Sequence, residues 1–399
     1  MKTINIFLFA ILMVPLCGCT QSAEKKALGL DDCLVVASKS IINGDTVITC
    51  DFSLVKDTID FPLSNIMSDL EMIKLENSDS ALVSRYHTFV SENYIGVYTM
   101  ENEYKLFDRQ GNFLCEIGRK GQGPGEYMFL YDSQIDEKNN RIYLMPWMQK
   151  KILVYNLQGK FLSDIPLPEF VPKARFNINT NKQIATIMIL PFKGQNNYVV
   201  WQQDFQGNIL QRISSEYFAL EPDYGNEVIS YRNTQNIDFY LAGWPDKQDT
   251  LYYYMGNENR LKPVFTFTAT EPFSHWYIDL PDHVITIIAQ QERMDENGQF
   301  YAPVPKQFIV DKRTLKGAYI KPVIDQLGGI SIPSRVLYQD GYFIANMYPH
   351  ELKDGLGKII RNTENNLSEQ KLPNIKTLYE DIDEEGNNYI LIGKLKSVK

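Results

Sequence analysis

A repeat with a spacing of about 50 residues constrains this fold more than any other feature of the sequence. Residues 104–117, 152–165 and 200–213 each read as an apolar strand, an Asp or Asn, two residues, a Gly and a second strand. The three glycines lie 48 residues apart, at Gly111, Gly159 and Gly207. Asp or Asn shortly before Gly is typical of a tight turn, because these residues accept left-handed backbone angles. Each segment is therefore predicted to be a β-hairpin with its glycine in the turn.

The pattern continues in weaker form, with further turns predicted near residues 258, 313 and 364. Additional strand candidates lie between the hairpins, at 141–145, 183–190, 238–242 and 342–345. Four strands in each unit of about 50 residues is the pattern of a β-propeller blade. No stretch of the body shows a sustained period of 3.6 residues, so few helices are expected. We therefore predict an all-β fold, a propeller of four-stranded antiparallel blades.

The number of blades depends on one segment. The span from residue 68 to 395 divides into six blades of roughly 55 residues or seven of roughly 47. Residues 358–372 favour seven blades if they form a blade hairpin and six if they are an insertion. Leu70–Glu76 and Tyr389–Leu395 are strand candidates without local hairpin partners. We expect these N- and C-terminal strands to pair in one blade, because pairing closes the ring and removes two exposed strand edges.

The N-terminus predicts export and lipid attachment. A positive charge at Lys2 precedes the apolar stretch Ile4–Leu16, which has the length of a signal-peptide core and is too short to span a bilayer. Leu16-Cys17-Gly18-Cys19 follows and matches the bacterial lipobox, in which the cysteine after the small residue is acylated. Cys19 is thus expected to become the first mature residue, and Cys17 to be removed. The expected division is a signal peptide (1–18), a tether with an N-terminal extension (19–60) and the propeller (61–399).

Composition limits the partners that this chain would have. The net charge of −9 argues against nucleic acid and anionic lipid as partners. No later stretch is long and apolar enough for a transmembrane helix, so a lipid would provide the membrane anchor. We expect a cell-envelope protein, anchored in the outer membrane on either its periplasmic or its surface face. A glycan, a peptide or another envelope protein is the expected partner, and no cofactor is expected.

Three further cysteines remain after the lipobox. An exported protein resides where disulfides persist. Cys33 and Cys50 would therefore either close a small disulfide loop or remain buried thiols. The spacing of these two residues and of Cys115 does not match a metal site, so no metal is expected.

The chain resembles the six-bladed β-propeller lipoproteins of Bacteroidetes, which are NHL-like in architecture. The most specific match is Lys105–Tyr127, which holds a strand, Asp-x-x-Gly, a strand, Ile-Gly-Arg and Gly-Gln-Gly-Pro-Gly-Glu-Tyr. A second match is Arg141-Ile-Tyr-Leu with the strand from Lys151, and a third is the segment from Phe61 to Glu76. The resemblance covers about Asp60 to Lys396 and implies six blades and an envelope lipoprotein. It implies no catalytic residue, because the family has no established reaction. The sequence departs from the family at residues 27–58, a segment that is longer than the family pattern predicts.

One glycine-rich loop has two interpretations. Its residues Gly121, Gln122, Gly123, Gly125, Glu126 and Tyr127 form a candidate ligand loop, since backbone N–H groups of successive glycines can bind an anion. Phosphate-binding glycine loops are followed by a helix, whereas here a strand candidate follows and Pro124 removes one N–H. The alternative, which we favour, is a rigid crossover between blades.

No catalytic constellation stands out in the sequence. The four histidines form no metal-binding pair: His87, His275, His283 and His350. The spacing of His275 and His283 would allow both to face one mouth of the ring, but the interpretation that we favour is solvated or hydrogen-bonded loop residues. There is no nucleophile elbow and no calcium loop. The four tryptophans either fill the space between blades or stack on ligands: Trp147, Trp201, Trp244 and Trp276. We therefore expect a non-enzymatic binding propeller, with a carbohydrate-active lyase or hydrolase as the alternative, or else a structural envelope component.

Overall fold

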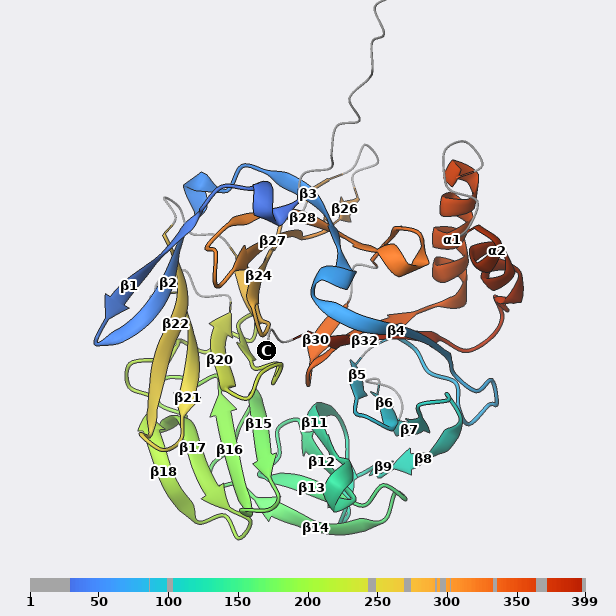
Figure 1. Ribbon diagram of the computed structural model, residues 1–399. Helices are drawn as coiled ribbons and strands as arrows, with labels where there is room; N and C mark the ends of the chain where they lie inside the picture. The colour runs from blue at the N-terminus through green and yellow to red at the C-terminus, as the bar shows by residue number, and fades with distance from the viewer. Residues whose placement is uncertain are drawn as a thin grey trace, which may run out of the picture.

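The computed structural model describes residues 29–85, 87–98, 103–242, 249–268, 274–290, 293–294, 299–301, 303–332, 336–363 and 372–396. Within this part of the chain, six four-stranded antiparallel units stand around a central axis (Figure 1). The fold is therefore an all-β propeller, as the repeat predicted, and it has the six blades that the family resemblance implied. None of its helices is long and apolar enough to cross a membrane within the described residues.

Each blade runs from an innermost strand at the axis to an outer strand. Blade 1 consists of β5 (His87–Val90), β6 (Tyr94–Tyr98), β7 (Tyr104–Asp108) and β8 (Phe113–Ile117). Blade 2 consists of β11 (Leu130–Asp136), β12 (Arg141–Pro146), β13 (Lys151–Tyr155) and β14 (Phe161–Pro166). Blade 3 consists of β15 (Ala174–Asn179), β16 (Ile184–Ile189), β17 (Tyr198–Asp204) and β18 (Ile209–Ser214).

The second half of the ring follows the same order with additions. Blade 4 consists of β19 (Glu227–Ile229), β20 (Ile237–Ala242), β21 (Thr250–Met255) and β22 (Arg260–Thr268). Blade 5 consists of β23 (His275–Asp279), β24 (His283–Ile288), β27 (Lys306–Asp311) and β28 (Gly317–Ile324). Blade 6 consists of β30 (Leu337–Gln339), β31 (Tyr342–Met347), β32 (Tyr389–Leu395) and β4 (Met67–Lys74). Short strands β9 (Arg119–Lys120), β10 (Glu126–Tyr127), β25 (Arg293–Met294), β26 (Phe300–Tyr301) and β29 (Ile330–Ser331) lie in the connections.

The three predicted turn glycines occupy the predicted hairpins. Gly111, Gly159 and Gly207 join the third and fourth strands of blades 1, 2 and 3, with φ angles of 89°, 77° and 89°. In the first and third of these turns an aspartate begins the bend. The carboxylate of Asp108, for example, accepts hydrogen bonds from the backbone N–H groups of Gln110 and Asn112, each at 2.9 Å. Glycine is favoured here because a side chain at positive φ would be strained.

The ring closes where the sequence predicted. Strand β4 pairs with β32 in antiparallel register, for example Ile73 opposite Ile390. One blade therefore takes its outer strand from near the N-terminus and three inner strands from the C-terminal part of the chain. This pairing satisfies backbone groups on strands that would otherwise be exposed edges.

Residues 358–372 were predicted to be either a blade hairpin or an insertion, and the structure shows an insertion, which decides the number of blades. Helices α1 (Pro349–Thr363) and α2 (Leu372–Asp381) are inserted between β31 and β32, and they lie beside blade 6 (Figure 1). Leu352 and Leu356, one helical turn apart, are fully buried, and Ile375 of α2 joins the same core cluster. Apolar residues four positions apart share one face of a helix, and this short pattern escaped the search for longer periods. The turn centre expected at 364 lies outside the described residues.

The N-terminal segment is part of the propeller rather than a separate extension. Strands β1 (Ala37–Ile42) and β2 (Asp45–Asp51) extend blade 4, where β2 pairs with β22 in parallel. Strand β3 (Thr58–Pro62) then pairs in parallel with β28 of blade 5. The expected boundary between residues 60 and 61 therefore falls inside a strand. Residues 37–74 supply outer strands to three successive blades and connect them around one side of the ring.

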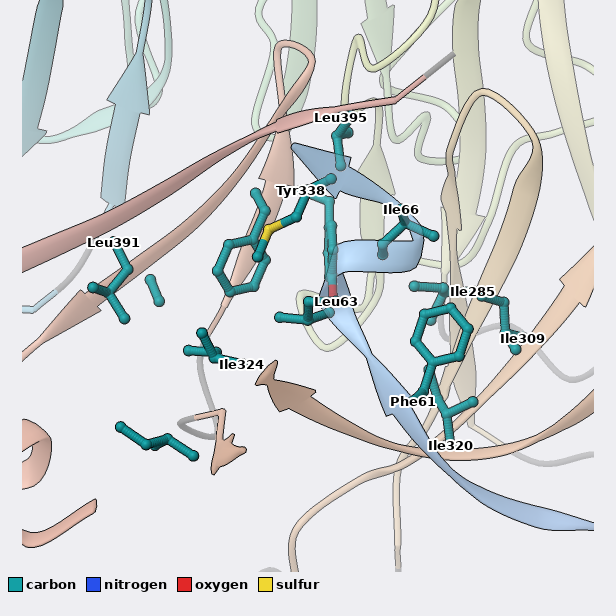
Figure 2. Packing of buried hydrophobic residues seen from close by; sticks show 14 of the residues in the cluster. Phe61, Leu63, Ile66, Ile285, Ile309, Ile320, Ile324, Tyr338, Leu391 and Leu395 are labelled. Atoms are coloured by element: carbon teal, nitrogen blue, oxygen red, sulfur yellow. The ribbon is translucent and has the colours of Figure 1, made fainter. Parts of the chain in front are cut away.

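A large core cluster lies between blades 5 and 6, and the N-terminal segment contributes apolar side chains to it. Phe61 of β3 and the adjoining Leu63 and Ile66 point into this cluster (Figure 2). They meet side chains from β24, β27, β28, β30 and β32, including Ile285, Ile309, Ile320, Tyr338 and Leu391. Burying one such side chain contributes about 1.5–3 kcal/mol. The N-terminal segment therefore joins two blades by apolar packing as well as by strand pairing.

Candidate functional site

The principal cavity of interest opens at the mouth of the ring where the innermost strands begin. We call it the cup. It has a volume of about 550 Å³, within the range of small-ligand sites. All six blades contribute to its lining, through residues that include His87, Tyr131, Arg175, Glu227, Trp276 and Gln339. A site shared by every blade exists only when the ring is closed.

Arg232, in the loop between β19 and β20, connects the inner strands across the ring below the cup. Its guanidinium donates to the Asp132 carboxylate at 3.1 Å and to the backbone carbonyls of Ser133 and Phe176, both at 3.0 Å. On its other edge it donates to the Asp340 carboxylate at 2.7 Å. One side chain of blade 4 thus binds blades 2, 3 and 6.

The neighbouring Asn233 completes this floor. Its amide nitrogen donates to the backbone carbonyls of Asp279, at 3.1 Å, and Tyr338, at 2.8 Å. Its amide oxygen accepts from the backbone N–H of Gly341 at 3.3 Å. The same loop therefore also binds blade 5 and makes further bonds to blade 6.

A buried carboxylate holds this loop in an unusual conformation. Arg232 has a φ angle of 56°, in a region that residues other than glycine seldom occupy. Asp238 accepts hydrogen bonds from the backbone N–H groups of Tyr231, at 2.8 Å, and Arg232, at 3.0 Å. Burial, together with the nearby Asp279, raises the pKa of Asp238 to about 6. Asp238 acts on the cup by positioning the floor and is not among the residues that line it.

The polar wall of the cup contains two carboxylates with several partners. Asp132 is bound to Arg232 and accepts from the backbone N–H of Phe176 at 3.3 Å. Glu227 lies 3.3 Å from the Lys173 ammonium and accepts hydrogen bonds from the Tyr131 hydroxyl and the Val228 N–H. Burial raises the pKa of Tyr131 far above its ordinary value, so the phenol remains a neutral donor.

His275 joins a second polar group at the cup wall, between blades 4 and 5. Its Nε2 lies 3.1 Å from the Asp249 carboxylate and 3.3 Å from the Tyr240 hydroxyl. Tyr240 donates to Asp249 at 2.9 Å, and Tyr277 donates to the same carboxylate. Burial is the larger cause of the raised pKa of both tyrosines, and the negative charge of Asp249 raises it further. The arrangement keeps both phenols protonated.

Exposed apolar side chains gather in the loops on the cup side. Ten large ones lie in connections between second and third strands or between blades: Leu82, Met128, Phe129, Trp147, Met148, Phe170, Tyr217, Tyr224, Met294 and Val304. Phe129 and Trp147 form an edge-to-face pair with centroids 6.1 Å apart. Among the described residues, no large apolar side chain is exposed in the turns between first and second strands, which form the opposite mouth. Such one-sided exposure is typical of a binding face.

The glycine-rich loop lies outside the cup lining and is occupied by its own glutamate. The Glu126 carboxylate accepts the Gly123 N–H at 2.8 Å, and a Cβ at residue 121 would collide with it. Tyr127 is buried, donating to the Ile117 carbonyl at 2.7 Å and accepting from the Tyr104 N–H at 2.9 Å. Gln122 is exposed. These contacts describe a crossover between blades 1 and 2, in which Glu126 takes the place that an external anion would need.

His275 and His283 lie at different mouths of the ring, so the shared mouth that their spacing allowed is not formed. His275 begins β23 opposite Ile288, whereas His283 begins β24 beside the turn that follows β23. The two residues therefore lie at opposite ends of blade 5, because successive strands of a hairpin run in opposite directions. His283 instead lies 3.7 Å from Asp311, and burial lowers its pKa.

The alternative disulfide between Cys33 and Cys50 is not formed. Both are buried free thiols, and Cys115 is also free. Cys33 packs in the core between blades 5 and 6, whereas Cys50 on β2 packs against blades 4 and 5 in a separate cluster. Burial raises the pKa of Cys50 to about 12, so this thiol remains protonated.

The tryptophans fall into different environments. Trp201 is fully buried and fills the core, whereas Trp276 lines the cup and Trp147 is 37% exposed on the cup side. Trp244 and Cys19 lie outside the described residues.

The sequence did not single out Arg175, Glu227 or Arg232, because an isolated polar residue near the start or end of a strand carries no recognisable motif.

The six blades and their shared central cavity define a β-propeller with a ligand-sized cup at one mouth. The chain belongs to the family described as Domain of unknown function (DUF4934), whose model matches residues 46–394. No curated protein matches it.

Among solved structures, the chain is similar to a protein from Bacteroides fragilis whose name describes it as exported. That similarity has a TM-score of 0.59 at 17% sequence identity and covers 88% of this chain and 100% of the other. A member of the DUF4221 family from Bacteroides vulgatus is also similar, with a TM-score of 0.48 at 10% identity, covering 83% of this chain and 97% of the other. At these identities, the first likeness concerns the fold alone.

Proposed function

We propose that this chain is a cell-envelope lipoprotein whose propeller binds a ligand or a partner protein in the cup without catalysing a reaction. The observation that carries the proposal is the cup itself, a cavity of about 550 Å³ shared by six blades and surrounded by loops with exposed apolar groups. Fold alone does not define function, so the proposal rests on this site.

Export and anchoring are the second part of the proposal. Leu16-Cys17-Gly18-Cys19 supports acylation of Cys19 and attachment to the outer membrane. The name of the Bacteroides fragilis relative agrees with export.

Binding is favoured over catalysis because the two carboxylates that line the cup are occupied. Asp132 and Glu227 each have a cationic partner within 3.3 Å. A general base works best with a pKa near the working pH, whereas burial moves the pKa of Tyr131 away from that range. The lining therefore offers shape and hydrogen bonding rather than a poised base.

The alternative, a carbohydrate-active lyase or hydrolase, is favoured by one observation. His275 lines the cup and contacts both Asp249 and Tyr240. However, the raised pKa of Tyr240 and Tyr277 opposes their use as bases. Release of reducing ends or unsaturated sugars from a polysaccharide by the wild type, lost in His275→Ala, would favour this alternative over binding.

The test of the binding proposal is capture of envelope components by the chain from Ala27 onward, which retains every residue that the structure describes. Trp276→Ala removes an aromatic wall of the cup and should abolish capture. Leu210→Ala, at an exposed position on the outer strand β18, is the control and should leave capture unchanged. Equal capture by wild type and Trp276→Ala would show that the cup is not the binding site.

A further inference from the structure

Arg175 differs from the other charged groups of the cup in its partners. It is the second residue of β15, the innermost strand of blade 3, and stacks over the Tyr131 ring, with its guanidinium carbon 5.0 Å from the ring centroid. One nitrogen donates to the Tyr131 backbone carbonyl at 3.1 Å. Within the described part of the chain, no carboxylate lies within ion-pair distance of this guanidinium. Most of its five N–H donors are therefore available at the cup wall.

The two nearby acids are already bound by other cations. Asp132 is held by Arg232 at 3.1 Å, and Glu227 by Lys173 at 3.3 Å. Arg85, the other arginine that lines the cup, is bound to Glu351 at 2.6 Å. Arg175 is thus the cup arginine that no described carboxylate binds directly, although, against the lowering effect of burial, the charges of Asp132 and Glu227 are near enough to raise its pKa. Its stacking on Tyr131 fixes the plane of the guanidinium, and a planar fork matches the two oxygens of a carboxylate.

The rest of the lining combines flat rings with polar groups. Trp276, Tyr231 and His87 line the cup, and the His87 ring stacks on Tyr98 at 5.2 Å. Ser274 and Gln339 line it as well. A hydroxylated ring presents both C–H faces and hydroxyl groups and would meet both kinds of surface. An apolar peptide end would leave the polar groups desolvated without partners, which is costly.

We propose that the cup binds an acidic saccharide, with the sugar carboxylate on the free edge of Arg175 and the sugar ring against the aromatic wall. This inference rests on the proposed binding function and names the ligand class for the same site. The cup holds about 550 Å³, so the site accepts a free sugar acid or the terminal unit of a chain.

Titration calorimetry on the chain from Ala27 onward tests this inference. The probes are glucuronic and galacturonic acid, their oligosaccharides, and the matched neutral sugars glucose and galactose. The acids are expected to bind at least about tenfold more tightly than the neutral sugars, a difference of about 1.4 kcal/mol. Tighter binding of oligosaccharides than of monosaccharides would identify a chain end as the source of the ligand, and equal binding a free sugar acid.

Substitution of Arg175 provides the decisive comparison. Arg175→Ala should remove the preference for the acid, and Arg175→Lys should retain part of it. Arg212→Ala is the matched control, because Arg212 also stacks over a tyrosine ring, that of Tyr198 at 4.9 Å, but lies on the outer strand of blade 3. Circular dichroism and melting temperature verify that each variant is folded.

Three outcomes would overturn the inference: equal affinity for acidic and neutral sugars, an acid preference that persists in folded Arg175→Ala, or binding only of peptides with a free C-terminus. These outcomes are distinguishable from failure of the proposed function. If Trp276→Ala abolishes capture of an envelope component but sugar acids do not compete for it, the binding function stands and the ligand class is wrong. If Trp276→Ala has no effect on capture, both are wrong.

Discussion

The guanidinium of Arg232 lies 3.1 Å from the carboxylate of Asp132, although 100 residues separate them in the chain. Arg232 comes from a loop of blade 4, and Asp132 from the innermost strand of blade 2. Both side chains are at least 95% buried, and Arg232 also binds Asp340 of blade 6. The floor of the cup is therefore also a link between blades. Because Arg232 makes these contacts, both the stability of the ring and the geometry of the cup depend on this residue.

We expect Arg232→Met to lower the free energy of unfolding by about 3–5 kcal/mol, because it leaves two carboxylates without their cation. Urea denaturation followed by tryptophan fluorescence measures the change. The control Arg212→Met removes an exposed arginine and should stay within about 0.5 kcal/mol of wild type. A loss no larger than that of the control would show that the link between blades is not important for stability.

The stability of the ring should depend on the protonation of Asp238. Its pKa is about 6 in the folded protein and near 4 in an unfolded chain. The folded state therefore binds more protons between these values, and this group's contribution to stability falls as pH rises from about 4 to 6. Asp238→Asn lacks the titration, so its stability relative to wild type should improve over that interval. Parallel pH profiles of the two proteins would contradict the assignment.

The pairing of β4 with β32 predicts cooperative unfolding of the whole ring. Deleting residues 389–399 exposes the edges of β31 and β4, so the truncated protein should be insoluble or should melt without a sharp transition. Deleting only 397–399 retains β32 and is the control. A monomeric protein that lacks 389–399 yet melts sharply at the full-length temperature would place the closure elsewhere.

Glu126 is expected to stabilise the crossover between blades 1 and 2 without taking part in binding. Glu126→Ala leaves the Gly123 N–H without its carboxylate and should reduce the free energy of unfolding by about 1–2 kcal/mol. Capture of envelope components should be unchanged at a temperature where the variant is folded. Gln122→Ala, at an exposed neighbouring position, should affect neither quantity. Loss of capture in folded Glu126→Ala would revive the ligand-loop interpretation.

Lipid attachment is tested independently of the fold. Cys19→Ala should release the protein from the membrane fraction and abolish labelling by a fatty-acid probe in cells. Cys33→Ala serves as the control, because Cys33 is a buried thiol of the propeller. Persistent labelling of Cys19→Ala would exclude Cys19 as the modified residue.

The sequence alone determined the architecture of this protein. Turn chemistry at Gly111, Gly159 and Gly207 is local, and a repeat places identical local signals at equal intervals, so blades and hairpins are visible without tertiary information. The pairing of Leu70–Glu76 with Tyr389–Leu395 followed from the same logic, since a ring leaves each end only one partner. The insertion after β31 was one of two open alternatives, but its helices were not predicted, because the apolar pattern of Leu352 and Leu356 is too short to identify a helix by period.

The site was decided by tertiary structure. Arg175, Glu227 and Trp276 come from three blades. The two charged residues carry no recognisable motif, and the sequence left open whether Trp276 fills the core or contacts a ligand. They meet because ring closure brings the start of every innermost strand to one mouth, a consequence of long-range pairing that no local pattern contains. The same applies to the guanidinium of Arg232, whose buried partners Asp132 and Asp340 each come from about 100 residues away in the chain. Its left-handed backbone, in contrast, is held locally by Asp238. Local chemistry specified the blades, and only their assembly around one axis created the cup.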